Sequence, residues 1–243
     1  LVYTYLPTSA DKTYFLPPTL TNGNVHGIIV LNVYNERLLR LLAETQIPKV
    51  FLDTSSLVAP DELNGDLLLM ESRTSVRRIT SHLLEQGRTL PGFIGDIGYA
   101  QSNRERYEGF CQALTDAGKK VDSSLCLTTP LGIDTYREEI DTFLSSLSRM
   151  PDAFVCASDY VACILMQLLE KRGLRVPEDV AVSGFDNNTE DLLAEHLTTV
   201  QVFNEELGAR LALQILYRIK YPNTPHEITY LGTNVLYRDS TGD

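Results

Sequence analysis

Two acidic residues stand where buried runs of the sequence end, and their surroundings offer hydrogen-bonding chemistry. Asp159 follows the apolar run Ala153–Ala157 and Ser158, and Asp186 directly follows the buried run Val180–Phe185. Ligands of open α/β sheets bind at the carboxyl ends of the strands, so we expect both carboxylates at such a rim. The same rim would carry a hydroxyl and two aromatic rings, from Ser158, Tyr160 and Phe185. These groups can hold a polar ligand, but they do not pair a nucleophile with a base.

Two more apolar runs end in an aspartate, Asp53 after VFL and Asp96 after FIG. Aspartate is common where a strand turns into a helix, because its carboxylate accepts hydrogen bonds from the free amides at the helix start. Helix capping alone can account for the presence of any single one of the four acids. For Ser158, helix capping and ligand contact are equally good explanations. We therefore expect one or two of the four acids, rather than all of them, to line a polar cleft.

The sequence lacks the motifs of common enzyme classes. Residues 92–98 have GxxGxxG spacing, not the GxGxxG of dinucleotide-binding loops, and carry an acid where phosphate would approach. There is no GxxxxGK(S/T) loop and no GxSxG elbow. FLDTSS is only a weak aspartyl-phosphotransfer signal, because no second acid follows two residues on. The histidines are scattered and the cysteines show no CxxC spacing, so we predict no catalytic residue, no metal site and no cofactor.

The composition indicates which partners and compartment to expect. The net charge of −11 over 243 residues repels phosphate backbones, so we do not expect this chain itself to bind DNA or RNA. No apolar run approaches the roughly 20 residues of a membrane helix, and LVYTYLPTS lacks the features of a signal peptide. Four cysteines without metal-ligand spacing are expected to be reduced thiols, which favours a cytoplasmic protein without membrane contact.

Apolar runs alternate with helical spacing along most of the chain. The expected strands are 25–31, 49–53, 66–70, 93–97, 124–127, 153–157, 180–185 and 197–202, with a strand or strand pair over 227–238. The expected helices are 36–46, 74–86, 102–117, 135–149, 158–173 and 204–221. LVYTY at the start also has the pattern of a strand, followed by a loop over 7–24. Strands that alternate with helices through short links predict a doubly wound parallel α/β fold.

Several longer patterns occur together. R-x-x-G-F-x-x-A-L begins at Arg106, and a polar-Asp pair, Ser158-Asp159, opens a helix after an apolar strand. Gly173–Asp186 follows G-L-x-V-P-x-D-V-x-V-x-G-F-D, LTTV at Leu197–Val200 precedes a helix containing Leu207-Gly208, and R-x-S-T begins at residue 238. In this combination, essentially the whole chain resembles the effector-binding core of the lac-repressor (LacI/GalR) family of bacterial transcription regulators.

The resemblance implies a periplasmic binding protein-like core of type I. Two Rossmann-like subdomains with parallel sheets would be joined by three crossover segments, with a small molecule in the cleft. The N-terminal subdomain would comprise 1–98 plus 202–224, and the C-terminal subdomain 99–201 plus 225–243. The crossings would fall near 98–101, 200–202 and 223–227. LVYTY would match the family's second strand, so the first βα unit and the DNA-binding helix-turn-helix are expected to be missing from this chain.

The resemblance also assigns effector contacts in the C-terminal subdomain. The family's effector-binding arginine falls on Arg106, for which an interaction along its own helix with Ser102 or Glu105 is the alternative. The strand-end aspartate that accepts sugar hydroxyls falls on Asp186. A position that is often Asn in the family falls on Ser158, whose shorter side chain makes capping an equal alternative.

Further contacts follow from the same resemblance. They fall on Ser102, Asn204 and Ser75, while Phe185 or Tyr99 would stack on a ring face. Carboxylate, guanidinium, hydroxyl and aromatic groups suit a neutral polyol, because the charged groups bridge its hydroxyls and the rings cover its apolar face.

The function implied by the family is ligand sensing. The chain would bind a mono- or disaccharide, or a derivative, and couple it to operator DNA through the missing N-terminal domain. A homodimer is implied, and helix 36–46, with Leu38, Leu39 and Leu42, is the candidate dimer face. The alternative is an extracytoplasmic sugar-binding protein of a transporter, which shares the fold. An enzyme is not expected.

Overall fold

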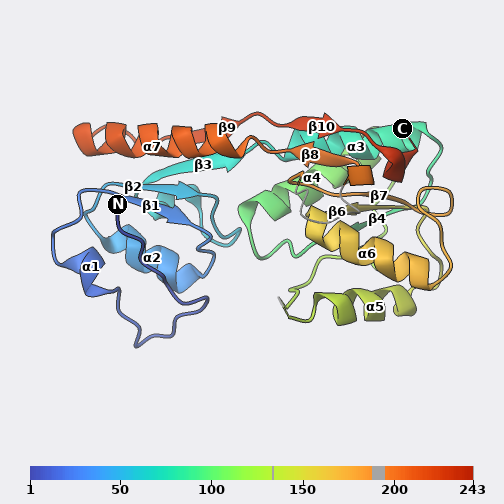
Figure 1. Cartoon of the computed structure of the whole chain (residues 1–243), viewed down its shortest axis with the longest axis horizontal. Helices are drawn as coiled ribbons and strands as arrows, with labels where there is room; N and C mark the ends of the chain where they lie inside the picture. Colours follow the sequence, from blue (N-terminus) through green and yellow to red (C-terminus); the bar gives the residue numbers. More distant parts are fainter. Residues whose placement is uncertain (133, 188–194, 243) are drawn as a thin grey trace. The chain divides into compact units, whose positions relative to one another are not determined.

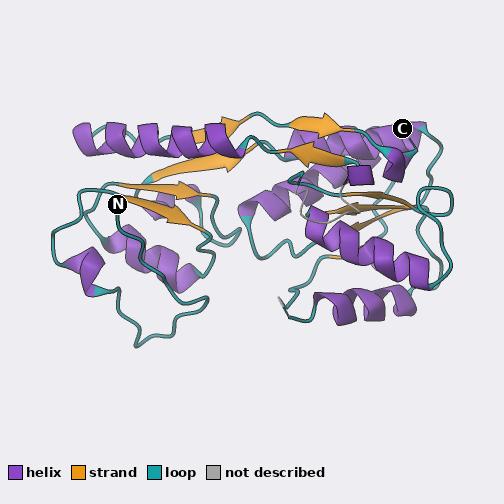
Figure 2. Cartoon of the chain, in the orientation of Figure 1, coloured by secondary structure: helices purple, strands orange, loops and turns teal. Residues whose placement is uncertain are grey.

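The computed structural model describes residues 1–132, 134–187 and 195–242, which form two compact units. Unit 1 comprises Leu1–Met70, Tyr99–Ser102 and Phe203–Gly232. Unit 2 comprises Glu71–Gly98, Asn103–Val202 and the chain from Thr233 onward. Each unit has its own parallel sheet with helices packed against it (Figures 1 and 2), which confirms the predicted α/β fold class. Residues 133, 188–194 and 243 of the predicted C-terminal subdomain lie outside the described residues.

The sheet of unit 1 is parallel, with the strand order β1-β2-β3-β9. Its strands are β1 (Ile28–Leu31), β2 (Lys49–Leu52), β3 (Asp66–Met70) and β9 (Ile228–Leu231). β2 and β3 are almost entirely buried along their length, which is typical of parallel strands covered on both faces. β9 is an edge strand that pairs only with β3 among the described strands.

Two helices cover this sheet, α2 (Glu36–Glu44) and α7 (Asn204–Lys220), and Figure 1 shows them on opposite faces. Asn35 begins α2 by accepting a hydrogen bond from the amide of Leu38 at 3.1 Å. α7 turns Leu207, Leu211 and Ile215 inward. Two short helices, α1 (Pro18–Thr21) and the 3-10 turn η1 (Pro60–Leu63), complete the unit.

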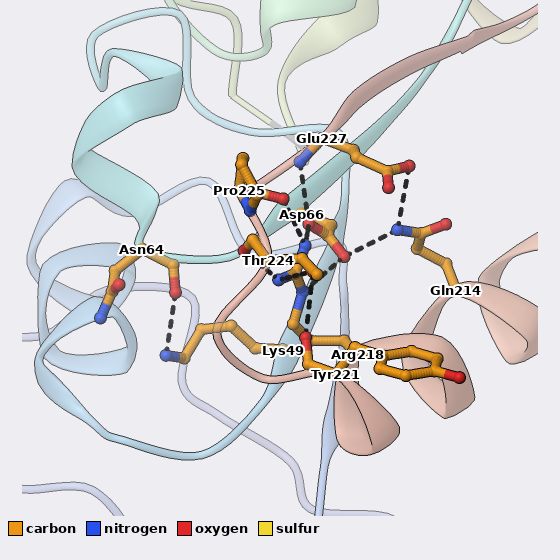
Figure 3. A network of polar contacts seen from close by, with 9 residues as sticks. All are labelled: Lys49, Asn64, Asp66, Gln214, Arg218, Tyr221, Thr224, Pro225 and Glu227. Carbon is orange, nitrogen blue, oxygen red and sulfur yellow. Dashed lines mark hydrogen bonds and ion pairs between the residues drawn. The ribbon is translucent and has the colours of Figure 1, made fainter.

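A buried ion pair joins α7 to the sheet of unit 1 (Figure 3). Asp66, the first residue of β3, accepts hydrogen bonds from Arg218 Nε at 3.0 Å and Gln214 Nε2 at 2.8 Å. Its carboxylate also accepts the backbone amide of Glu227 at 2.9 Å, just before β9. Arg218 donates onward to the carbonyl of Pro225 at 2.9 Å, and the side chains of Asp66 and Arg218 are each only 2% exposed. The pair therefore fixes α7, β3 and the turn into β9 against one another.

The main sheet of unit 2 is also parallel, with the order β5-β4-β6-β7. Its strands are β4 (Pro91–Ile94), β5 (Cys126–Leu127), β6 (Ala153–Cys156) and β7 (Ala181–Ser183). β8 (Thr199–Gln201) and β10 (Asn234–Leu236) form a separate antiparallel pair. Isolated bridges from residues 183 and 186 to residues 198 and 201 place β8 beside the end of β7.

Helices cover both faces of the unit 2 sheet. They are α3 (Arg73–Glu85), α4 (Gln101–Asp116), α5 (Tyr136–Ser146) and α6 (Asp159–Lys171). The first two residues of α4 belong to unit 1, and the rest of the helix belongs to unit 2. Unit 2 also contains the 3-10 turns η2 (Ser123–Leu125) and η4 (Asp239–Thr241). Figure 1 shows α5 and α6 on one face and α3 on the other. Gly109 lets α4 approach α3 closely, because a Cβ there would lie 2.2 Å from the carbonyl oxygen of Arg73.

The observed division of the chain differs from the expected boundaries in three stretches. Residues 71–98, expected with the first subdomain, belong to unit 2, because β4 pairs with β5 and β6. Residues 225–232, expected with the second subdomain, belong to unit 1, because β9 pairs with β3. Residues 99–102, expected with the second subdomain, are counted with unit 1. The chain therefore changes unit at 70/71, 98/99, 102/103, 202/203 and 232/233. The changes at 98/99 and 202/203 lie near expected positions, whereas 70/71 was not expected and 232/233 lies beyond the expected 223–227.

Two other expectations are wrong. The opening residues LVYTY form no strand and are mostly exposed, because no described strand lies beside them. Leu38, Leu39 and Leu42 do not offer a dimer face, because each is at most 1% exposed and packs inside unit 1.

Candidate functional site

The carboxyl end of the unit 2 sheet gathers a cation, an anion and an aromatic ring, which we call the Arg106 cluster (Arg106, Phe185 and Asp186). Arg106 lies on α4, after β4, whereas Phe185 and Asp186 follow β7. A helix or loop that follows a parallel strand starts at the carboxyl edge of the sheet, so the topology brings these residues to one rim. This is the position that the sequence predicted for Arg106, Phe185 and Asp186.

Arg106 is held by three contacts with unit 2. Its Nη1 donates a hydrogen bond to the carbonyl of Ala157 at the end of β6. The guanidinium carbon lies 3.7 Å from the ring centroid of Phe185, which is a cation–π geometry. Nη2 lies 3.6 Å from Asp186 Oδ1. The side chain is 6% exposed, yet Nε has no hydrogen-bond partner among the described residues.

Asp186 presents a partly free carboxylate next to this cation. Its φ of +110° lies in a region that most side chains avoid, and its amide donates to the carbonyl of Val200 at 3.1 Å. At 3.6 Å the contact with Arg106 is an ion pair without a hydrogen bond, and the Asp186 side chain is 43% exposed. Desolvation raises the pKa of Asp186, and the positive charge of Arg106 opposes this rise. Both charged groups thus keep hydrogen-bonding capacity, and that of Asp186 is open to a polar ligand.

The start of α6 lies directly beside the cluster. The Asp159 amide donates to the carbonyl of Phe185 at 2.8 Å, and the Asp159 carboxylate accepts from Thr199 Oγ1 at 2.6 Å. Ser158 caps the helix, because its Oγ accepts the amide of Val161 at 3.3 Å. Asp159 is buried, so its role is to hold the rim together, whereas Ser158 is partly exposed and beside it.

Sequence reasoning missed the residues that hold Asn187 and strand β7 in place. Arg238 Nη2 donates to Asn187 Oδ1 at 2.8 Å, and Asn187 Nδ2 donates to Gln201 Oε1 at 2.6 Å. Ser240 Oγ donates to the carbonyl of Val182 at 2.6 Å. The R-x-S-T pattern was a signal for this support, because Arg238 and Ser240 are its first and third residues.

Three predicted contacts, Ser102, Tyr99 and Asn204, lie in unit 1. Ser102 is buried at the start of α4, and its Oγ donates to Asp53 Oδ2 at 2.6 Å. Asp53, at the end of β2 with a φ of +59°, also accepts the amides of Thr54 and Ser102, so it acts as the cap that the sequence allowed. Tyr99 is 47% exposed and its ring centroid lies 4.3 Å from that of Tyr34. Asn204 is an exposed residue at the start of α7.

Ser75 does not join the Arg106 cluster. It is buried on α3, and its Oγ is shared between Glu71 Oε2 at 3.1 Å and Thr233 Oγ1 at 2.8 Å. Thr233 Oγ1 also donates to the carbonyl of Glu71 at 2.8 Å. Unit 2 begins at Glu71 and begins again at Thr233, and these contacts hold the two starting points together.

Comparison with known proteins identifies the fold. The model of the family described as "Periplasmic binding protein-like domain" matches residues 80–241, well over half of the chain. The chain belongs to this family. The matched range includes all three residues of the Arg106 cluster.

The similar proteins are transcription regulators. The chain is 27% identical over 216 residues to the HTH-type transcriptional repressor PurR of Glaesserella parasuis, covering 88% of this chain and 62% of that protein. A solved regulator of the LacI family from Sanguibacter keddieii has a TM-score of 0.74 and 26% identity, covering 93% of this chain and 80% of that one. The solved complex of the transcriptional regulator CelR with cellobiose has a TM-score of 0.81 and 27% identity, and the match covers 91% of this chain and 68% of the CelR chain.

These comparisons make this periplasmic binding protein-like chain an effector-binding core of the LacI/GalR type, as its motifs indicated. The chain spans less than two thirds of the length of the PurR repressor that it matches. The cysteines at 111, 126, 156 and 163 are all free thiols. Over the described ranges, we find no helix with the length and apolar character needed to span a membrane.

Proposed function

We propose that this core senses a neutral carbohydrate, a mono- or disaccharide or a derivative, and that the Arg106 cluster binds it. The observation that carries the proposal is the loose ion pair between Arg106 and Asp186 beside Phe185. A carboxylate can accept two vicinal hydroxyls, and a guanidinium can donate to ring and hydroxyl oxygens. The exposed side of Asp186 is open for such bonds, and Arg106 Nε is a buried donor that still lacks a hydrogen-bond partner among the described residues.

The likeness to the CelR–cellobiose complex supports a carbohydrate as the class of ligand. The Arg106 cluster has groups for binding and orientation, and we propose that the ligand leaves chemically unchanged. Ser158, Ser102, Asn204, Ser75 and Tyr99 stay predicted contacts. Ser75 and Ser102 are buried, whereas Tyr99 and Asn204 are exposed and therefore more accessible to a ligand.

We further propose that ligand binding is coupled to operator DNA through a domain outside this chain, in a cytoplasmic homodimer. A ligand can shift a conformational equilibrium only through different affinities for its states, and such coupling typically amounts to about 1–3 kcal/mol. In the full-length protein, the bound saccharide should therefore change operator affinity by about 5- to 150-fold.

The test compares Asp186→Asn with the unaltered chain by titration calorimetry. The probes are glucose, galactose, cellobiose, maltose and lactose. Asparagine tolerates the positive φ at this position but loses the charge, so the fold should hold and the melting temperature should stay the same. A hydrogen bond to a charged group is worth about 1.5–3 kcal/mol, so the affinity should fall about 10- to 150-fold.

The matched control is Asp179→Asn, which removes the same charge from the surface of unit 2 and should leave affinity unchanged. Equal affinities of Asp186→Asn and the unaltered chain would remove Asp186 from the site. Failure of all five sugars to bind would contradict the carbohydrate assignment itself.

A further inference from the structure

A separate cavity lies between α5 and α6 in unit 2. Its volume is about 350 Å³, which falls at the lower end of the range of about 300–1,000 Å³ for small-molecule sites. The described residues that line it on α6 are Tyr160, Cys163, Ile164 and Gln167. Opposite them, the chain from Asp134 to Glu138 contributes Tyr136 and Arg137. Cys163 and Ile164 are buried apolar groups, so the other side chains give the cavity its polar character.

Two tyrosine rings form an aromatic corner of this cavity. The ring centroids of Tyr136 and Tyr160 are 5.7 Å apart and the rings are nearly perpendicular, at 85°. Tyr160 is 60% exposed, which is a large open ring on an otherwise packed helix. Burial, and to a smaller extent the charge of Asp96, raises the pKa of Tyr136, so its hydroxyl is a neutral hydrogen-bonding group at ordinary pH.

Polar groups stand around the two rings. Arg137 Nη2 donates to Gln167 Oε1, which fixes both side chains across the gap between the helices. Asp134 and Glu138 add carboxylates to the lining. An exposed ring face beside an amide, a guanidinium and carboxylates can cover the apolar face of a pyranose while its hydroxyls are bridged. The lining therefore suits the same ligand chemistry as the Arg106 cluster.

The cavity and the Arg106 cluster share the first turn of α6. Arg106 donates to the carbonyl of Ala157, and the amide of Asp159 donates to the carbonyl of Phe185. Tyr160 is the next residue along the chain, so the cavity begins one residue from the backbone that holds the cluster. Both lie at the carboxyl edge of the same sheet, because α5 and α6 follow β5 and β6.

We propose that the cavity between α5 and α6 binds one ring of a carbohydrate longer than a monosaccharide, while the Arg106 cluster holds another ring. The proposal rests on the carbohydrate function above and narrows its ligand class. Tyr160 supplies the stacking face, and the fixed Arg137–Gln167 pair supplies hydroxyl contacts. The preferred effector is thus a disaccharide or larger, and the cavity sets the preference.

The test measures the dissociation constants of the same five sugars for Tyr160→Ala and Tyr160→Phe. An aromatic contact is worth about 0.5–1.5 kcal/mol, so Tyr160→Ala should weaken at least one disaccharide by up to about tenfold. Glucose and galactose should change less than twofold, because they need only the Arg106 cluster. Tyr160→Phe keeps the ring and should retain most of the disaccharide affinity.

The control variant is Tyr217→Ala, which removes a partly exposed ring from the Tyr217–Tyr221 pair at the end of α7 in unit 1. It should leave every dissociation constant unchanged. The melting temperature of each variant shows whether the fold is intact. The inference is overturned, with the proposed function intact, if Tyr160→Ala binds disaccharides normally or loses monosaccharides equally. If none of the five sugars binds the unaltered chain, both proposals are overturned together.

Discussion

Replacing Arg218 by methionine should remove a large part of the stability of unit 1. Methionine fills similar space, so the main loss is the charge and its hydrogen bonds. Asp66 would stay buried, 2% exposed, with only Gln214 and the amide of Glu227 as partners. Removing one partner of a buried ion pair costs about 3–5 kcal/mol, because the other charge is left uncompensated. We expect a value in that range at pH 7.

The deficit should shrink as the pH falls. Burial acts to raise the pKa of Asp66 and is the largest single influence, but hydrogen bonds from Arg218, Gln214 and Glu227 outweigh it and hold the pKa below 3.8. In the unaltered protein this carboxylate therefore stabilises the fold above about pH 4, and that contribution is lost as the pH falls through the folded-state pKa. In Arg218→Met the main opposing bonds are gone, so Asp66 takes up a proton in the folded state at a higher pH and relieves the unpaired charge.

Hydrogen exchange of peptides from β3 and β9 measures the opening free energy of unit 1, because the two units need not unfold together. Arg175→Met is the matched control, since Arg175 pairs with Asp179 on the surface and is 69% exposed. Such surface pairs contribute about 0–1 kcal/mol. A loss below 1 kcal/mol for Arg218→Met at pH 7, or a loss that grows toward pH 4, would refute the reasoning.

Two further predictions concern stability. Burial lowers the pKa of Lys49 from 10.5 to about 8, so between those pH values the unfolded chain binds more protons and stability should rise with pH, by up to about 3 kcal/mol. Urea midpoints from pH 7.5 to 10 should show this rise in the unaltered protein but not in Lys49→Met; equal slopes would disprove it. Gly109→Ala would push a methyl group against the backbone of Arg73 and should destabilise unit 2 by about 1–3 kcal/mol, with a lower melting temperature. An unchanged melting temperature would show that α3 and α4 can move apart freely.

The elements of this protein could be predicted well because local patterns and burial agree. The strand at 66–70 and the helix beginning at Glu36 match the structure at the residue level, since apolar spacing and an Asn cap determine them. The Arg106 cluster was also predictable, because the order of strands and helices carries residues after β4 and β7 to one edge. Ser158 was predicted either to cap a helix or to contact the ligand. The structure shows the capping hydrogen bond and does not test the ligand contact.

Other features depend on pairings between distant residues, which local patterns do not specify. The strand-like sequence LVYTY has no strand beside it, so its apolar side chains stay exposed. The unit boundaries depend on the pairing of β9 with β3 and of β4 with β6. The side chain of Ser75 was expected to contact ligand, yet Thr233, 158 residues away in sequence, takes its hydrogen bond.

The pairing of β9 with β3 also has a consequence for the newborn polypeptide. Asp66 receives the amide of Glu227, 161 residues later in the chain. While the ribosome translates the stretch between them, β3 can pair with β2, but the edge of β3 that β9 later covers stays open, and such edges favour association with other chains. Unit 2, whose main sheet is complete by residue 183, can assemble first. The sheet of unit 1 can be completed only after β9 has been translated.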